Sequence, residues 1–263
     1  MKRCLVHLFC LPAEPRAFIS IPIPDITASK NIPKDNKTIY SFPMDYFSLK
    51  KLLFESADNK NMEFAKKVFN TSYKVIGLMT PTLKRIIQEH YKDDDLKLSD
   101  FELGEYQEID ITYLAIALKR AKSYKDQMEF LKKNLYFVKG WAVTDVLNQY
   151  LKKATFAEYF PYFEHFAKCK NTYEVRFAYV GMLKHCDSPD IEKITPLLRY
   201  NEEYMVMMAE AWLLATVAIK HSDFVYGLLK NMNDEAFKKK TISKMNESFR
   251  ISKEDKERFK ALR

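Results

Sequence analysis

The chain has 263 residues, of which 47% are hydrophobic, and its 43 Lys and Arg outnumber 35 Asp and Glu to give a formal net charge of +8. This length and apolar content permit a substantial core in one large domain or two small ones. Only five glycines occur, which disfavours glycine-rich phosphate loops and hairpin-rich β architectures. The positive charge favours an anionic partner such as nucleic acid or acidic lipid.

The cysteines give no sign of a metal centre. Cys4, Cys10, Cys169 and Cys186 form no Cys-x-x-Cys pair and have no histidine cluster beside them. We therefore expect no metal site, no cofactor, and reduced thiols in a cytoplasmic protein. No run of eighteen apolar residues is present, so no membrane span is expected. The first eleven residues resemble a signal peptide, but the segment after them is a poor cleavage region.

Residues 1–43 differ in composition from the rest of the chain. Six of the ten prolines lie here, and helical periodicity is absent. We interpret this segment as a Pro-rich extended or disordered leader. The alternative is that it lies upstream of a gene start at Met44, where the first helical pattern opens. The predicted domain is then 44–263.

From Met44 onward, apolar residues recur at helical spacing, and the pattern predicts one helix after another. Thr80 is a predicted hydroxyl N-cap before Pro81, Ser188-Pro189-Asp190 is a typical helix start, and Asp234 is a predicted N-cap. The predicted helices are 45–56, 60–69, 80–92, 106–122, 124–134, 140–152, 155–168, 172–186, 190–199, 203–220, 222–232, 234–248 and 253–262.

These helices group into pairs at a nearly regular spacing. The pairs 140–168, 172–199 and 203–232 suit stacked units in which each pair buries its apolar face against its neighbours. We predict an all-α fold, an α-solenoid of HEAT-like helix pairs that is curved with a concave basic groove. Because the pairs share no sequence signature, a non-repetitive helical bundle is the alternative.

One predicted helix carries an indole and a carboxylate on the same face. Trp141 and Asp145 lie four residues apart, and Asn148 continues their face at the next turn. We expect this face to point away from the core. A surface tryptophan beside a solvated aspartate has the same spacing, so the pattern alone leaves both interpretations open.

Two later helices carry further candidate residues. Arg176 stands early in the otherwise apolar helix 172–186, where it can bind phosphate or pair with Glu174 or an acid of a neighbouring helix. Trp212 lies in a helix that is apolar almost all round, so core packing is an alternative role for it. Glu210 in the same helix requires a partner or an exit to solvent.

Taken in order, these motifs resemble those of the DNA alkylation repair family, which includes AlkD-like DNA glycosylases with HEAT-like repeats. The resemblance covers about residues 45–250 and rests on Trp-x-x-x-Asp at 141–145, Arg-x-Ala at 176–178 and Ala-x-Ala-Trp-x-Leu at 209–214. An early Gly-x-x-Thr-Pro element at 77–81, followed by Lys84 and Arg85, completes it.

The resemblance implies a role for each matching residue. Asp145 would be the catalytic carboxylate, and Trp141 and Trp212 would flank the nucleotide that carries the lesion. Arg176 would hold the DNA backbone, and Lys84 and Arg85 would contact phosphates. The implied partner is double-stranded DNA containing alkylated bases, bound by a monomer without a metal or small-molecule cofactor.

The implied reaction is hydrolysis of the N-glycosidic bond of cationic N3- or N7-alkylpurines. These bases already carry a positive charge, so they leave readily, and a fixed carboxylate and indole faces stabilise the charge that develops on the sugar. Ala142 stands where active members often have an acidic residue, and the Met-rich run before Trp212 is closer to a branch that lacks base excision. The alternatives are thus a catalytically silent HEAT-repeat DNA-binding protein or a protein-interaction scaffold.

Overall fold

The structure is a computed structural model, and it describes residues 44–69, 72–200 and 203–262. The predicted leader 1–43 lies outside these residues. Within them the chain is helical, and the sole extended pairing is one isolated bridge between Lys74 and Tyr106. The all-α prediction is therefore confirmed. No described helix is both long and apolar enough to cross a bilayer.

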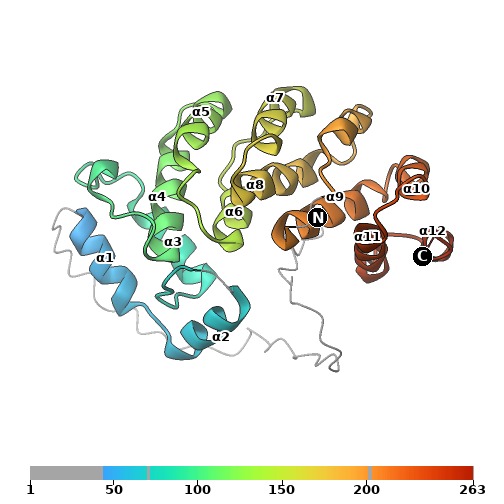
Figure 1. The fold of residues 1–263 in the computed structure, drawn as a ribbon. Coiled ribbons are helices and arrows are strands. Elements are labelled where there is room, and N and C mark those ends of the chain that lie inside the picture. Colours follow the sequence, from blue (N-terminus) through green and yellow to red (C-terminus); the bar gives the residue numbers. More distant parts are fainter. Residues whose placement is uncertain (1–43, 70–71, 201–202, 263) are drawn as a thin grey trace, which may run out of the picture. The chain divides into compact units, whose positions relative to one another are not determined.

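Most predicted helices are present within one or two residues of their expected bounds (Figure 1). The α-helices are α1 (Tyr46–Glu55), α2 (Asn59–Phe69), α3 (Thr80–His90), α4 (Gln107–Arg120), α5 (Tyr124–Asn134), α6 (Trp141–Leu147), α7 (Phe156–Ala167), α8 (Thr172–Met182), α9 (Tyr204–Val217), α10 (Ser222–Lys230), α11 (Glu235–Glu247) and α12 (Lys253–Lys260). Short 3-10 helices are η1 (Leu98–Asp100), η2 (Leu183–His185) and η3 (Ile191–Leu197).

The largest deviation is α6, which is predicted over 140–152 and ends at Leu147. Other helices satisfy the backbone of the missing turn. Lys184 Nζ donates to the Asn148 carbonyl, and Gln127 Nε2 donates to the Tyr150 carbonyl at 3.0 Å. Gln127 Oε1 in turn accepts from the Lys152 N–H at 2.8 Å. These side-chain bonds replace the helical bonds, so the chain turns early.

The segment predicted as helix 190–199 is instead the 3-10 helix η3. Pro196 lies inside it, and proline removes a donor and disfavours the α conformation of the preceding residue. The predicted hydroxyl cap at Thr80 is also wrong, since Thr80 is itself helical and the N-cap Met79 makes no side-chain cap bond. Asp234 does cap α11, where it accepts from the Phe237 N–H at 2.9 Å.

The helices pack in two layers. In one layer α4, α6, α8, α9 and α11 contact one another in succession (Figure 1). In the other, α5, α7, α10 and α12 pack on α4, α8, α9 and α11 respectively. This pairing is consistent with a helical repeat fold. One continuous core of buried apolar side chains runs between the layers.

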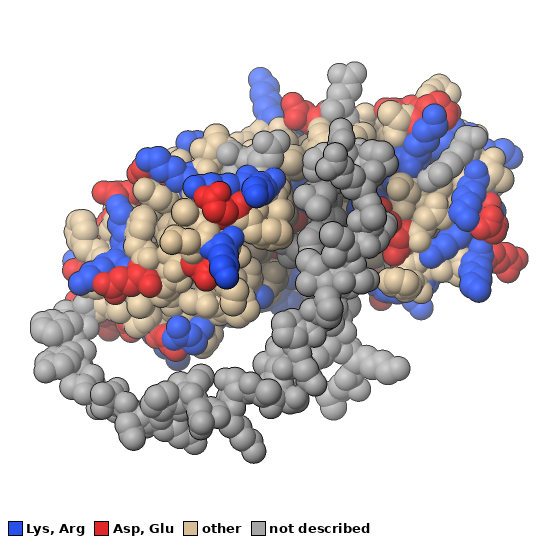
Figure 2. All heavy atoms as spheres, turned by 90° about the horizontal axis from the view of Figure 1, so that it is seen from below, with Lys and Arg blue, Asp and Glu red and all other residues tan. Residues whose placement is uncertain are grey.

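Charged side chains are interspersed on the face in Figure 2, with Lys and Arg most crowded toward the end formed by α10, α11 and α12. This matches the excess of basic residues after Lys238 in the sequence. A continuous concave basic groove stays a prediction.

Candidate functional site

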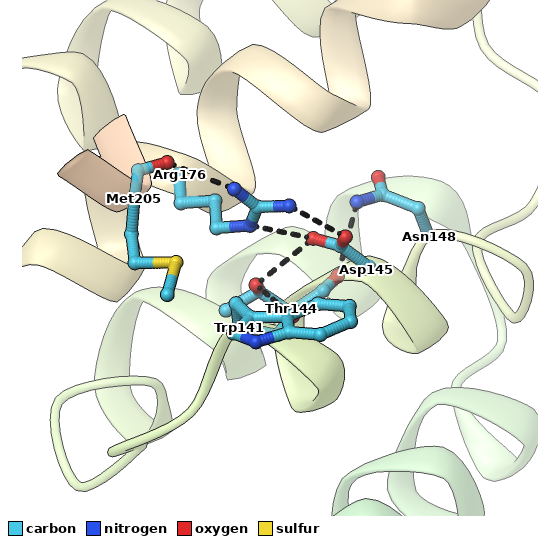
Figure 3. Close-up of polar contacts among 6 residues, drawn as sticks. All are labelled: Trp141, Thr144, Asp145, Asn148, Arg176 and Met205. Carbon is cyan, nitrogen blue, oxygen red and sulfur yellow. Dashed lines mark hydrogen bonds and ion pairs between the residues drawn. The ribbon is translucent and has the colours of Figure 1, made fainter. Parts of the chain in front are cut away.

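A buried ion pair joins α6 to α8. Arg176 Nε donates to Asp145 Oδ1 at 2.9 Å, and Arg176 Nη2 donates to Asp145 Oδ2 at 2.8 Å (Figure 3). The side chains are 1% and 8% exposed. Two parallel charge-assisted bonds fix both the position and the plane of the carboxylate. Arg176 therefore pairs with an acid, as one of the two alternatives from the sequence had it. That acid is Asp145 of a neighbouring helix rather than Glu174.

The guanidinium also reaches a third helix. Its Nη1 donates to the Met205 carbonyl at 2.8 Å, so Arg176 lies between α9 and the carboxylate (Figure 3). Asp145 and Arg176 are each the fifth residue of their helix, and Met205 is the second residue of α9. Residues of three helices thus meet at one point, and Arg176 and Met205 come from the N-terminal halves of α8 and α9.

Trp141 completes the cluster from the first position of α6. Its ring lies 5.6 Å from the Arg176 guanidinium carbon, within cation–π range. The indole is only 3% exposed, so the expectation that it points away from the core is wrong. The reason is that Arg176 and the neighbouring helices cover it. Thr144 Oγ1 donates to the Trp141 carbonyl at 2.8 Å and reinforces this turn.

A second buried carboxylate holds the start of α6. Asp110 of α4 accepts from Tyr73 Oη at 2.6 Å and from the Gly104 N–H at 2.9 Å. Tyr73 Oη accepts from the Lys139 N–H at 3.1 Å, and Lys139 Nζ donates to the Gly104 carbonyl at 2.9 Å. Burial raises the pKa of Asp110 and that of Tyr73. This network ties α4 to the backbone two residues before Trp141.

The early Gly-x-x-Thr-Pro element is held by a different acid. Glu108 of α4 accepts from the N–H groups of Ile76, Gly77 and Leu78 at 3.0, 2.8 and 3.4 Å. Gly77 has φ +100°, and a Cβ there would stand 2.7 Å from the Cβ of Met62, so glycine is required. The motif is therefore a packed structural turn that sets the start of α3.

The predicted phosphate contacts Lys84 and Arg85 lie on α3. Arg85 is exposed and bonds Glu89 of its own helix at 3.1 Å. Lys84 is half-buried. No contact of the described residues joins either one to the Asp145–Arg176 pair, so the structure does not bring them into that cluster.

Trp212 lies on the same face of α9 as Met205, seven residues and about 10 Å further along. It is half-buried and packs against the core. The structure therefore gathers Trp141, Asp145 and Arg176 in one cluster, and Trp212 stands two turns away. Glu210, two residues before it, is fully buried and accepts from the Arg199 N–H, so the partner that the sequence required is present.

Two basic residues beside the cluster were not singled out from the sequence. Lys139 is exposed just before α6. Lys240 of α11 lies over the ring of Tyr204, 5.7 Å from its centroid, and Tyr204 adjoins Met205. Lys240 stands within a basic run, 238–240, which was visible in the sequence. Its place beside α9 depends on tertiary packing.

Comparison with known proteins agrees with these motifs. A search of curated proteins found no match to the chain. The model of the DNA alkylation repair enzyme family matches residues 49–245, which is most of the chain and includes Trp141, Asp145, Arg176 and Trp212. The chain belongs to the DNA alkylation repair enzyme family.

Proposed function

We propose that this DNA repair protein is a DNA glycosylase that binds alkylated duplex DNA and releases cationic N3- or N7-alkylpurines. The bond between C1′ and the purine nitrogen breaks, and its electron pair leaves with the base and neutralises it. Positive charge then develops on the deoxyribose. Water adds to C1′ and loses one proton, which leaves an apurinic site and the free base.

The observation that carries this proposal is the fixed carboxylate of Asp145. Each of its oxygens accepts one bond from Arg176, and a carboxylate oxygen has a second lone pair. A preorganised carboxylate of this kind stabilises a developing cation without having to reorganise. It can also orient the attacking water. We assign Asp145 as the catalytic residue and Arg176 as the residue that positions it.

The surroundings of the pair suit a DNA backbone. Lys139 comes two residues before α6, and Lys240 lies over the ring of Tyr204, which adjoins Met205. Phosphate contacts of this kind position a duplex without reading its sequence. Binding through several phosphates weakens steeply with salt, a dependence that a protein-interaction scaffold would lack.

The test is release of free base from methylated duplex DNA. We expect 3-methyladenine or 7-methylguanine to appear above the spontaneous rate with the full chain, and we expect Asp145→Asn to abolish that excess. Because this change leaves a buried guanidinium without its counter-ion, the double variant Asp145→Asn/Arg176→Gln is measured beside it. A thermal melt shows whether each variant is folded.

Release at the spontaneous rate by the folded wild-type chain contradicts the glycosylase proposal. So does a folded Asp145→Asn variant that releases base as fast as wild type. The conservative variant Lys133→Gln, exposed on the last turn of α5, is the matched control and is expected to leave release unchanged.

One observation favours a second function, which is DNA binding without base release. Arg176 occupies both oxygens of Asp145, and Trp141 is 3% exposed. Under this second function, the cluster has a structural role and holds α6, α8 and α9 together. Salt-sensitive binding to duplex DNA together with base release at the spontaneous rate supports this second function.

A further inference from the structure

A pocket of about 340 Å³ lies at the opposite end of α6 from Trp141, at the lower limit of small-molecule sites. Leu151, Tyr159 and Gly181 supply apolar and aromatic lining. The pocket is formed by the loop that follows α6, the C-terminal end of α8 and the first residue of α5. None of Trp141, Asp145 and Arg176 lines it, so the pocket is distinct from the ion-pair cluster.

Three lysines from two segments line the same pocket. Lys152 and Lys153 follow α6, and Lys184 lies in η2 after α8. Within residues 44–69, 72–200 and 203–262, none of the three forms an ion pair with a carboxylate. Three ammonium groups around one concavity give it a strong positive potential.

Helix capping accounts for only one of these lysines. Lys184 Nζ donates to the Asn148 carbonyl at the end of α6, as cations near helix C-termini commonly do. Lys152 and Lys153 are exposed. The acid at the start of α7, Glu158, is occupied by the N–H and hydroxyl of Thr155 at 2.7 and 2.8 Å. The charge of Lys152 and Lys153 is therefore available to a ligand.

The remaining residues of the pocket lining are aromatic and carry polar groups. Tyr124 and His185 complete the wall, and the His185 ring stacks on Tyr159 with centroids 5.1 Å apart. A compact anion matches the lysines, and a planar group attached to it matches the aromatic wall. A phosphate group carried by a nucleoside has both parts.

We propose that this pocket binds the phosphate group of a nucleotide, separately from the Asp145 cluster and independently of base release. The phosphate can belong to a free mononucleotide or to a DNA backbone that reaches this end of the helices. In either case Lys152 and Lys153 supply the charge, and Tyr124 and His185, both half-buried, supply the contact surface.

The test is calorimetric titration of the full chain with thymidine 5′-monophosphate, inorganic phosphate and thymidine. Anisotropy with an undamaged duplex runs in parallel. The double variant Lys152→Gln/Lys153→Gln removes the two charges that do not cap α6. The matched control is Lys132→Gln/Lys133→Gln, an adjacent pair on the last turn of α5, about 12 Å along that helix from Tyr124.

The expected result is binding of the monophosphate but not of thymidine, weakened at least tenfold in the pocket variant and unchanged in the control. If only duplex affinity falls at least tenfold, again in the pocket variant alone, the phosphate belongs to the DNA backbone. Equal affinities of wild type and the folded pocket variant for every probe overturn the proposal. Base release is measured in a separate assay, so an absence of base release does not change the result of this binding test.

Discussion

Asp145 in α6 and Arg176 in α8 bind each other through two hydrogen bonds of 2.9 and 2.8 Å, while both side chains are almost completely buried. The third bond of Arg176, to Met205, extends the link to α9. One charged pair therefore couples three successive helices of one layer. It both presents the candidate catalytic carboxylate and holds its scaffold together.

Removal of only one partner of the Asp145–Arg176 ion pair should destabilise the protein strongly. Asp145→Asn leaves a buried guanidinium without a counter-ion, and we expect a loss of about 3–5 kcal/mol in the free energy of unfolding. The double variant Asp145→Asn/Arg176→Gln should lose clearly less than the sum of the two single changes, because both charges are gone. Urea unfolding of the four proteins measures the coupling. Additive losses would show that the two residues act independently.

The packing of α7 against α8 depends on a glycine. A Cβ on Gly181 would stand 2.0 Å from the hydroxyl of Tyr159, which donates to the Ala178 carbonyl at 2.9 Å. Gly181→Ala should therefore destabilise the protein by about 1–3 kcal/mol through overpacking. Gly227 of α10 has open space around its Cβ position, so Gly227→Ala should be neutral or stabilise by up to ~1 kcal/mol. Thermal melting of the two variants measures the difference, and equal changes in their melting temperatures would refute the steric argument.

His185 should make stability depend on pH. Burial lowers its pKa below the usual 6.5, helped by Lys184 and opposed by Asp187. The unfolded chain therefore binds the proton more readily, and the stability contribution, present above pH 6.5, is lost as the pH falls through 6.5 toward the lower folded pKa. His185→Phe keeps an aromatic ring against Tyr159 and should flatten the curve of unfolding free energy between pH 7 and 5. Part of the slope should persist, because the pKa of His165 is lowered too. Parallel curves for wild type and variant would contradict this assignment.

Lys139 and Lys240 should act as phosphate contacts. Replacing either one with Gln should weaken duplex binding and lower the slope of log affinity against log salt by about 1. Anisotropy titrations across a salt series measure both quantities, with Lys133→Gln on α5 as the control. A slope that is the same in all four proteins would mean that DNA does not pass over Lys139 and Lys240 beside the Asp145–Arg176 pair.

The sequence by itself determined the helices and the identity of the key side chains. Apolar periodicity and N-caps such as Asp234 are local properties, and the structure has the predicted helices with few exceptions. One exception, η3, has a local cause in Pro196, and another, α6, has a non-local cause. The last turn of α6 is absent because Lys184 and Gln127, distant in sequence, bind its carbonyls.

Only the tertiary structure decided which residues meet. Spacing placed Trp141 and Asp145 on one helix face, but it did not show that Arg176 would neutralise Asp145 or that the indole would be buried beneath the guanidinium. Nor did it show that Lys139, Lys240 and the pocket lysines would gather where they do. Helix formation follows from neighbours along the chain, whereas an ion pair between helices depends on how their axes pack, which local sequence does not encode.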